Sequence, residues 1–189
     1  MTDISIQLRM TIYSSLMAAL IAAGAFLAIP IGPVPIVLQN MFVLLAGLLL
    51  GGRWGLASVA VYLLAGIIGL PVFAAGKSGP GTIMGPTGGY LISYLPAVFV
   101  VGIISEKIGD SFSANKRKRM AVDLIAMLIG TAIIYACGVP WLKNVLGVPW
   151  SKALVFGMYP FLIGDGIKII AACVIAGVLR PIVNSRLEV

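Results

Sequence analysis

Six long runs of apolar residues, separated by short breaks, constrain this chain more than any other feature of its sequence. The runs cover residues 12–29, 36–50, 56–70, 90–104, 120–139 and 152–179. A helix needs about 20 apolar residues to cross a bilayer, and the glycine, proline and charged residues in the breaks are typical of helix ends. The pattern predicts an all-α membrane protein built as a bundle of six transmembrane helices.

Length and composition leave little room for anything else. Six spans of about 20 residues use roughly 120 residues, and the whole chain has 189. We therefore expect residues 1–189 to form a single membrane domain with no separate soluble domain. The chain has no histidine and only six acidic residues, so the usual residues of metal sites and hydrolytic triads are scarce. We expect a protein that is not an enzyme and has no metal or cofactor.

Positive charge is distributed unevenly over the predicted loops. If the N-terminus is cytoplasmic, the inner segments hold Arg9, Arg53, Lys107, Lys116, Arg117, Lys118, Arg119, Arg180 and Arg186. The outer segments hold only Lys77, Lys143 and Lys152. This positive-inside bias predicts that both termini are cytoplasmic, and it accounts for the net charge of +7 without a nucleic-acid partner. The run 116–119 either holds the loop inside or contacts anionic lipid or a partner.

Two features of the apolar runs have alternative interpretations. The first run resembles a signal peptide, but cleavage near residues 23–25 would remove one span and spoil the charge pattern, so we interpret it as a transmembrane helix. Cys137 and Cys173 lie in different apolar runs without CxxC spacing. That arrangement is typical of buried, unreactive thiols.

Asp165 and Lys168 lie near the middle of the last apolar run. Asp165 is fifteen residues from both Trp150 and Arg180, which corresponds to about 22 Å of helix on either side. Ionisable groups at that depth cost at least ~2.5 kcal/mol each and must face protein or water. Their i, i+3 spacing places them on one helix face, either as a binding pair or as an ion pair that only neutralises itself. Pro160 is expected to kink the helix just before them.

The segment GPTGGY at residues 85–90 leads into the fourth run from outside. Thr87 is a candidate N-cap, and Gly88 and Gly89 leave backbone N–H groups uncovered at the positive end of the helix dipole. Such a helix start can bind a carboxylate, although a tight turn explains the same residues. Nearby sequences that imitate nucleotide-binding loops lack the required glycines, so we expect no ATP site.

Two further segments suggest a cavity lid and a docking face. Residues 33–39 form a proline-stiffened outer loop with Val34 in it and Gln39 at its end, which serves either as a lid or as a plain connector. The first run carries a face of small residues that permits close helix packing, against either the chain's own helices or a partner membrane subunit. These residues are Ser15, Ala18, Ala19, Ala22 and Ala23.

Four segments together resemble one known family, the BioY proteins. They are VPIVLQ at residues 34–39, GIIGLPVF at 66–73, GPTGGY at 85–90 and GDGIK at 164–168. BioY proteins are the biotin-binding S components of energy-coupling factor (ECF) transporters. The resemblance implies a multi-pass protein of the bacterial cell membrane that captures extracellular biotin. It also implies that a T component and two ATPase subunits power transport, and that the small-residue face docks on the T component.

The resemblance implies roles for the candidate residues. Asp165 would accept the ureido N–H groups of biotin, and Lys168 would donate to the ureido carbonyl. Gly88, Gly89 and the helix start at Thr87, or else Lys77, would bind the carboxylate, although the reverse assignment with Lys168 on the carboxylate stays open. Tyr90, Tyr159 and Phe161 are candidate apolar walls, with Val34 and Gln39 completing the site.

Two other functional classes stay open on the sequence alone. An ion- or proton-coupled secondary transporter of a small carboxylate-bearing solute would use Asp165 as its carrier, but no inverted repeat is visible. A membrane enzyme would need a nucleophile with a base or paired carboxylates, and the sequence presents neither pattern.

Overall fold

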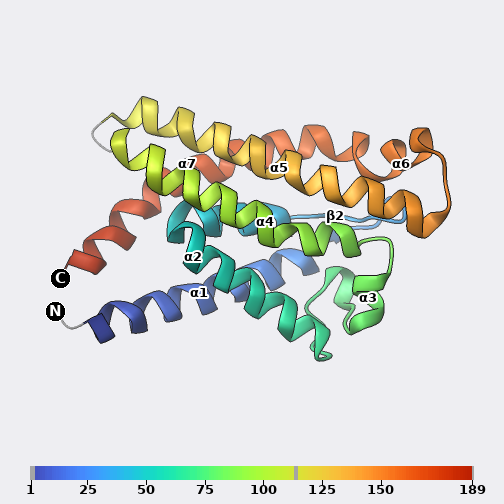
Figure 1. The fold of residues 1–189 in the computed structure, drawn as a ribbon, viewed down its shortest axis with the longest axis horizontal. Coiled ribbons are helices and arrows are strands. Elements are labelled where there is room, and N and C mark those ends of the chain that lie inside the picture. Colours follow the sequence, from blue (N-terminus) through green and yellow to red (C-terminus); the bar gives the residue numbers. More distant parts are fainter. Residues whose placement is uncertain (1–2, 113–114, 189) are drawn as a thin grey trace.

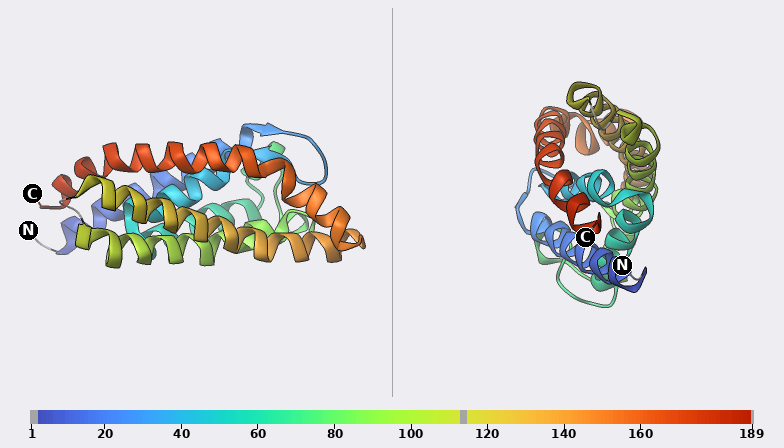
Figure 2. Two further views of the ribbon diagram at one scale, coloured as in Figure 1. Left: turned by 90° about the horizontal axis from the view of Figure 1, so that it is seen from above. Right: turned by 90° about the vertical axis from the view of Figure 1, so that its left-hand side faces the viewer.

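The computed structural model describes residues 3–112 and 115–188, and most of these are helical. Within this described part of the chain, five helical segments are long and apolar enough to cross a membrane: Ile6–Phe26, Gln39–Ile67, Gly88–Gly109, Lys116–Leu146 and Trp150–Val183. They form an elongated bundle, and the two ends of the chain lie at the same end of it (Figures 1 and 2). The start of the fourth of these helices, at Lys116, lies at that end too, whereas α3 (Pro80–Met84) and α6 (Trp150–Gly157) lie at the other (Figure 1).

The helices and strands follow one another in a simple order. The bundle helices are α1 (Asp3–Phe26), α2 (Gln39–Ile67), α4 (Gly88–Ile104), α5 (Lys116–Leu146) and α7 (Leu162–Glu188). Between them lie β1 (Ala28–Ile29), β2 (Ile36–Val37), α3 (Pro80–Met84) and α6 (Trp150–Gly157). Short helical turns complete the chain: η1 (Ala74–Gly76), the π-helical turn η2 (Ser105–Gly109), η3 (Asp110–Phe112) and η4 (Tyr159–Phe161).

The second and third predicted runs are the two arms of α2, which corrects the expected loop at 51–55. Gly51 alone departs from helical geometry, with φ 77° and ψ −176°. A Cβ added to Gly55 would lie 3.1 Å from the Cα of Gly47, whereas residues eight apart in a straight helix are about 12 Å apart. The chain therefore folds back on itself at Gly51. The Glu106 carboxylate accepts from the Gly52 N–H at 3.3 Å and caps the second arm.

The last two helical regions also differ from the predicted boundaries. The predicted break after Val139 does not occur: α5 continues through Pro140 to Leu146 and ends at Gly147, which adopts the left-handed conformation. The predicted run 152–179 is divided between α6 and α7 by the turn η4. Pro160 lies in that turn, so the expected kink before Asp165 is confirmed.

The loops between the helices gather at the end of the bundle away from the termini. The expected stiff loop at 33–39 contains β2, which pairs antiparallel with β1 in a short hairpin. Because β1 takes residues 28–29, the first helix ends at Phe26, before the predicted end at residue 29. The glycine-rich segment after α2 contains η1 and α3, and Phe73 in it is completely buried. A Cβ on Gly66 would lie 2.2 Å from the Phe73 ring, so only glycine there admits this anchor. Phe73 also packs edge-on against Tyr62 of α2, with ring centroids 5.7 Å apart.

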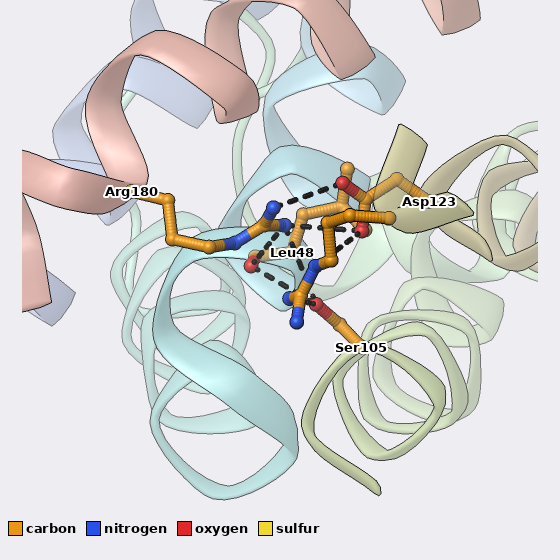
Figure 3. A network of polar contacts seen from close by, with 5 residues as sticks. Leu48, Ser105, Asp123 and Arg180 are labelled. Carbon is orange, nitrogen blue, oxygen red and sulfur yellow. Dashed lines mark hydrogen bonds and ion pairs between the residues drawn. The ribbon is translucent and has the colours of Figure 1, made fainter. Parts of the chain in front are cut away.

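A buried ionic cluster ties four helical elements together toward the opposite end (Figure 3). Arg180 of α7 binds both carboxylate oxygens of Asp123 of α5 at 3.0 Å and donates to the Leu48 carbonyl of α2 at 3.2 Å. Arg119 lies 3.5 Å from the same carboxylate and donates to Ser105 at 2.8 Å. Arg119 and Arg180, which the charge bias predicts to lie on the inner side, therefore also make contacts inside the bundle. The Arg186 side chain, another predicted inner charge, lies outside the described residues.

The outer face of α7 is apolar and exposed. Its large side chains recur every three or four residues, as expected of a helix face in contact with lipid. They are Ile163, Ile167, Ile170, Val174 and Val178.

Candidate functional site

A cavity of ≈ 160 Å³ lies beneath the loops, at the end of the bundle away from the termini. The β1–β2 loop, the η1 segment and the starts of α2, α4 and α7 enclose it. Its lining residues are Pro30, Gly32, Pro33, Val34, Pro35, Val37, Gln39, Asn40, Phe73, Ala74, Ala75, Lys77, Thr82, Thr87, Tyr90, Leu91, Tyr94, Tyr135, Gly157, Phe161, Asp165 and Lys168. The walls are therefore mainly apolar and aromatic, with a few polar groups, as in most small-molecule sites.

Asp165 and Lys168 form a buried ion pair on the wall of this cavity. The Lys168 ammonium lies 3.0 Å from Asp165 Oδ1, and the two residues are only 8% and 5% exposed. Both lie in the first two turns of α7, directly after the break at η4, so their i, i+3 spacing keeps them on one face. Because the pair is buried, either charge would be costly if it lost its hydrogen-bonding partners.

Two more side chains bind the pair from neighbouring helices. Asn40 of α2 donates to Asp165 Oδ1 at 2.9 Å, and its carbonyl oxygen accepts from Lys168 at 3.3 Å. Tyr135 of α5 donates to Asp165 Oδ2 in a short hydrogen bond. Three helices thus meet at one carboxylate.

The surrounding residues hold these groups in place. Gln39, 1% exposed, donates to the Tyr62 hydroxyl at 2.6 Å and so joins the two arms of α2 beside the cavity. The Tyr90 hydroxyl donates to the Gly157 carbonyl at 2.9 Å. Gly138 and Gly157 provide the space for that ring, because a Cβ at either would lie 2.3 Å or less from Tyr90 atoms.

The cavity suits a small solute that is mostly apolar and has hydrogen-bond donors and acceptors together at one end. The carboxylate accepts, the ammonium donates, and the aromatic walls bury apolar surface. Among the described residues, no three histidine, cysteine, aspartate or glutamate side chains lie close enough together to hold a metal ion.

Comparison with known protein families gives a match that extends over nearly the whole chain. The model of the BioY family matches residues 1–185. The chain belongs to the BioY family.

Similar proteins cover almost the full length of this BioY chain. The biotin transporter BioY of Thermotoga maritima is 40% identical, covering 95% of this chain and 100% of that one. The probable biotin transporter BioY of Pyrococcus horikoshii is 38% identical, covering 86% and 90%. The fold resembles a 2.1 Å crystal structure of the S component for biotin from an ECF-type ABC transporter. That structure is 36% identical, with a TM-score of 0.85, covering 96% of this chain and 95% of that chain.

The structure brings seven of the ten predicted binding residues of the BioY chain to the cavity. Those on its lining are Val34, Gln39, Lys77, Thr87, Tyr90, Asp165 and Lys168. Phe161, the other predicted aromatic wall, is there too. Thr87 is at the N-cap position of α4, but its side chain makes no capping hydrogen bond.

The remaining three predicted residues lie off the cavity lining. Gly88 and Gly89 pack against protein: a Cβ on Gly88 would lie 1.6 Å from the Ile83 carbonyl oxygen, and one on Gly89 would lie 2.3 Å from Trp141. Tyr159, in the turn η4, is 54% exposed. The two glycines therefore leave space for Ile83 and Trp141 to pack against the start of α4.

Asn40, Tyr94 and Tyr135 line the cavity but were not predicted. Their signal in the sequence is weak, because a single amide at a helix start and single tyrosines in apolar runs are common. Asn40 follows Gln39, which the family motif includes, and that adjacency was the one available indication.

The small-residue face of α1 is divided by the packing of the bundle. Ser15, Ala19 and Ala23 are exposed at spacing i, i+4, i+8, whereas Ala18 is buried and Ala22 is half-buried. Of the two thiols, Cys173 is buried as predicted, but Cys137 is exposed on the surface of α5, so the expectation of a buried Cys137 was wrong.

Proposed function

We propose that this chain is the biotin-binding S component of an ECF-type transporter, which captures extracellular biotin with high affinity and one-to-one stoichiometry. The observation that carries the proposal is the buried Asp165–Lys168 pair on the wall of a mostly apolar cavity. The names of its BioY relatives and of the similar crystal structure support it.

The shape and chemistry of biotin match the cavity. Biotin has a neutral ureido ring with two N–H donors and one carbonyl, an apolar thioether ring and chain, and a terminal carboxylate. Asp165 would accept from the ureido N–H groups and Lys168 would donate to its carbonyl. Tyr90, Tyr94 and Phe161 would bury the apolar rings.

Lys77 is the candidate partner for the valerate carboxylate. It lies on the cavity lining and its side chain is exposed, so it can reach an acid group near the mouth without a large desolvation penalty. Gly88 and Gly89 are less suited, because Ile83 and Trp141 fill the space beside them. The helix start at Thr87 would contribute through its dipole alone.

The membrane arrangement we propose has six crossings in the plasma membrane with both termini in the cytoplasm. Counting the two arms of α2 separately turns the five candidate spans into six. The positive-inside bias supports this orientation, which places the cavity at the outer surface. The exposed stripe of Ser15, Ala19 and Ala23 on α1 would dock on the T component, which with two ATPase subunits would power uptake.

Calorimetry on the detergent-purified chain tests the binding proposal. Biotin is expected to bind one-to-one, and 5-cyclopentylpentanoic acid, which keeps a ring and acid chain but lacks the ureido group, is expected to bind much more weakly. Equal heats for the two compounds would contradict the proposal. ATP hydrolysis by the chain alone, or its uptake of biotin along an imposed ion gradient without ATPases, would contradict the division of labour with partner subunits.

A further inference from the structure

Asn40 presents to Asp165 and Lys168 the same pair of groups that a ureido ring would present. Its amide N–H donates to Asp165 Oδ1 at 2.9 Å, and its amide carbonyl accepts from Lys168 Nζ at 3.3 Å. With the Lys168–Asp165 contact of 3.0 Å, these bonds close a ring of three side chains. A cyclic urea also carries an N–H and a carbonyl on one short edge, so it can make the same two bonds.

We propose that Asn40 is an internal substitute for the ureido group of the ligand, a role that rests on the proposed function. When the cavity is empty, its amide satisfies the buried ion pair. When the ligand enters, the ureido group takes over the two hydrogen bonds and the Asn40 side chain turns away from the pair. Binding is then an exchange of one amide for another.

The burial of the site makes such a substitute useful. Asp165 and Lys168 are 5% and 8% exposed, so an unpaired donor or acceptor on either would be expensive. Tyr135 donates to the far oxygen of Asp165, whereas the Lys168 ammonium donates to Asp165 and to the Asn40 carbonyl. Asn40 is half-buried on the cavity lining, where a side chain can change rotamer into the open volume.

The exchange has a measurable consequence for selectivity. A ligand without a ureido group leaves Asn40 in place, and the ion pair stays satisfied beneath it. Without Asn40, the same ligand would displace water from Asp165 and Lys168 and would make no hydrogen bonds to replace those of the water. Asn40 therefore moderates the preference of the site for ureido compounds.

The test measures the affinities of biotin and 5-cyclopentylpentanoic acid for wild-type chain and Asn40→Ala by calorimetry in detergent. We expect Asn40→Ala to bind biotin within about threefold of wild type and to bind the ureido-free acid about tenfold more weakly. Ser58→Ala is the matched control: it removes a fully buried polar group of the same helix that is bound only to the Trp54 carbonyl, and it should change neither affinity.

The other outcomes overturn the inference in distinguishable ways. A selective loss of biotin affinity in Asn40→Ala would make Asn40 a direct ligand contact, and an equal loss for both compounds would make it a structural residue. If Asn40→Ala does not unfold cooperatively on heating, Asn40→Ser, too short to bridge both partners, replaces it with the same expectations. Absence of biotin binding by the wild-type chain would refute the proposed function itself, before any variant is measured.

Discussion

Glycine residues create the contacts that bring α4 into place beside the cavity. At Gly89 the chain passes so close to α5 that a Cβ would lie 2.3 Å from the Trp141 Cβ, and Trp141 in turn donates to the Gly85 carbonyl at 2.9 Å. The start of α4 is thus fixed by close packing and by one hydrogen bond. Tyr90 and Thr87 reach the cavity lining from this anchored segment.

Gly89→Ala should destabilise the chain by about 1–3 kcal/mol, because the added methyl group overpacks the contact with Trp141. Thermal unfolding in detergent measures the change. Gly177→Ala is the matched control, since a Cβ there meets nothing within 4 Å. An unchanged melting temperature for Gly89→Ala would contradict the close contact.

Removal of either charge of the central pair should weaken biotin binding. Asp165→Asn and Lys168→Met each leave one buried charge without its partner and remove a charge-assisted hydrogen bond to the ligand. The expected loss is about tenfold to a hundredfold in affinity, from about 1.5–3 kcal/mol. Titration calorimetry against wild type and the exposed-site variant Lys152→Gln checks it, and undiminished affinity in both variants would place the ureido group elsewhere.

Charged residues in apolar runs are the part of the site that the sequence can predict. Asp165 and Lys168 are identifiable because such groups are costly in a membrane unless they face protein or water. Asn40 and Tyr135 are not, because their importance depends on the packing of α2 and α5 against α7, which no local pattern encodes. Gly88 and Gly89 would look the same in the sequence whether they left backbone N–H groups free for a ligand or made space for a neighbouring side chain.

The reversal in α2 sets the position of Gln39 and Asn40. With φ 77° and ψ −176°, Gly51 lies in a region of backbone space that is essentially restricted to glycine. The hydrophobic pattern predicts both arms of α2, and the pair Gly51–Gly52 indicates a break. The sequence does not show that the reversal takes place at Gly51 alone, because a break of this kind is also compatible with an ordinary loop at 51–55.

Gly51→Ala should destabilise the α2 hairpin by about 1–3 kcal/mol through backbone strain alone. The added Cβ would also lie 1.8 Å from Glu106 Oε1, so the cap on the second arm must move. Chemical or thermal unfolding gives the change. If Gly51→Ala is as stable as wild type, the second arm begins differently from this structure.

The fold as a whole separates two polar clusters by the length of α7. One is the cavity-lining set around Asp165, and the other is the Arg119–Asp123–Arg180 cluster near the termini (Figure 3). Fifteen residues separate Asp165 from Arg180, about 22 Å of helix. The sequence predicted the inner position of Arg119 and Arg180 but not the pairing of Arg180 with Asp123, since that contact joins residues 57 positions apart.

Asp123→Asn should destabilise the folded chain by about 3–5 kcal/mol, because two buried guanidinium groups lose their common counter-charge. The melting temperature in detergent reports the loss, with the exposed-site variant Lys116→Gln as the reference. Since the cluster is far from the cavity, biotin affinity of the folded fraction should remain close to that of wild type. A stable Asp123→Asn variant would show that the cluster is dispensable.

Labelling with a membrane-impermeant maleimide tests the orientation of the bundle. In a background with both native cysteines replaced by alanine, Lys152→Cys should react in intact cells and Lys116→Cys only after permeabilisation. Both positions are exposed, so accessibility to solvent is not limiting. The reverse pattern would invert the topology and put the cavity on the cytoplasmic side.

The cavity has a floor. Beneath Asp165 the described helices close on Leu44, Val101 and Met127, all 2% exposed or less, and then on the ionic cluster. In the proposed orientation, a solute can enter this cavity from the outer side. It can leave toward the inner side only if the helices separate or if the whole chain reorients in the membrane. Either event requires work against this packing or against the bilayer, and in the proposed division of labour the partner subunits supply that work.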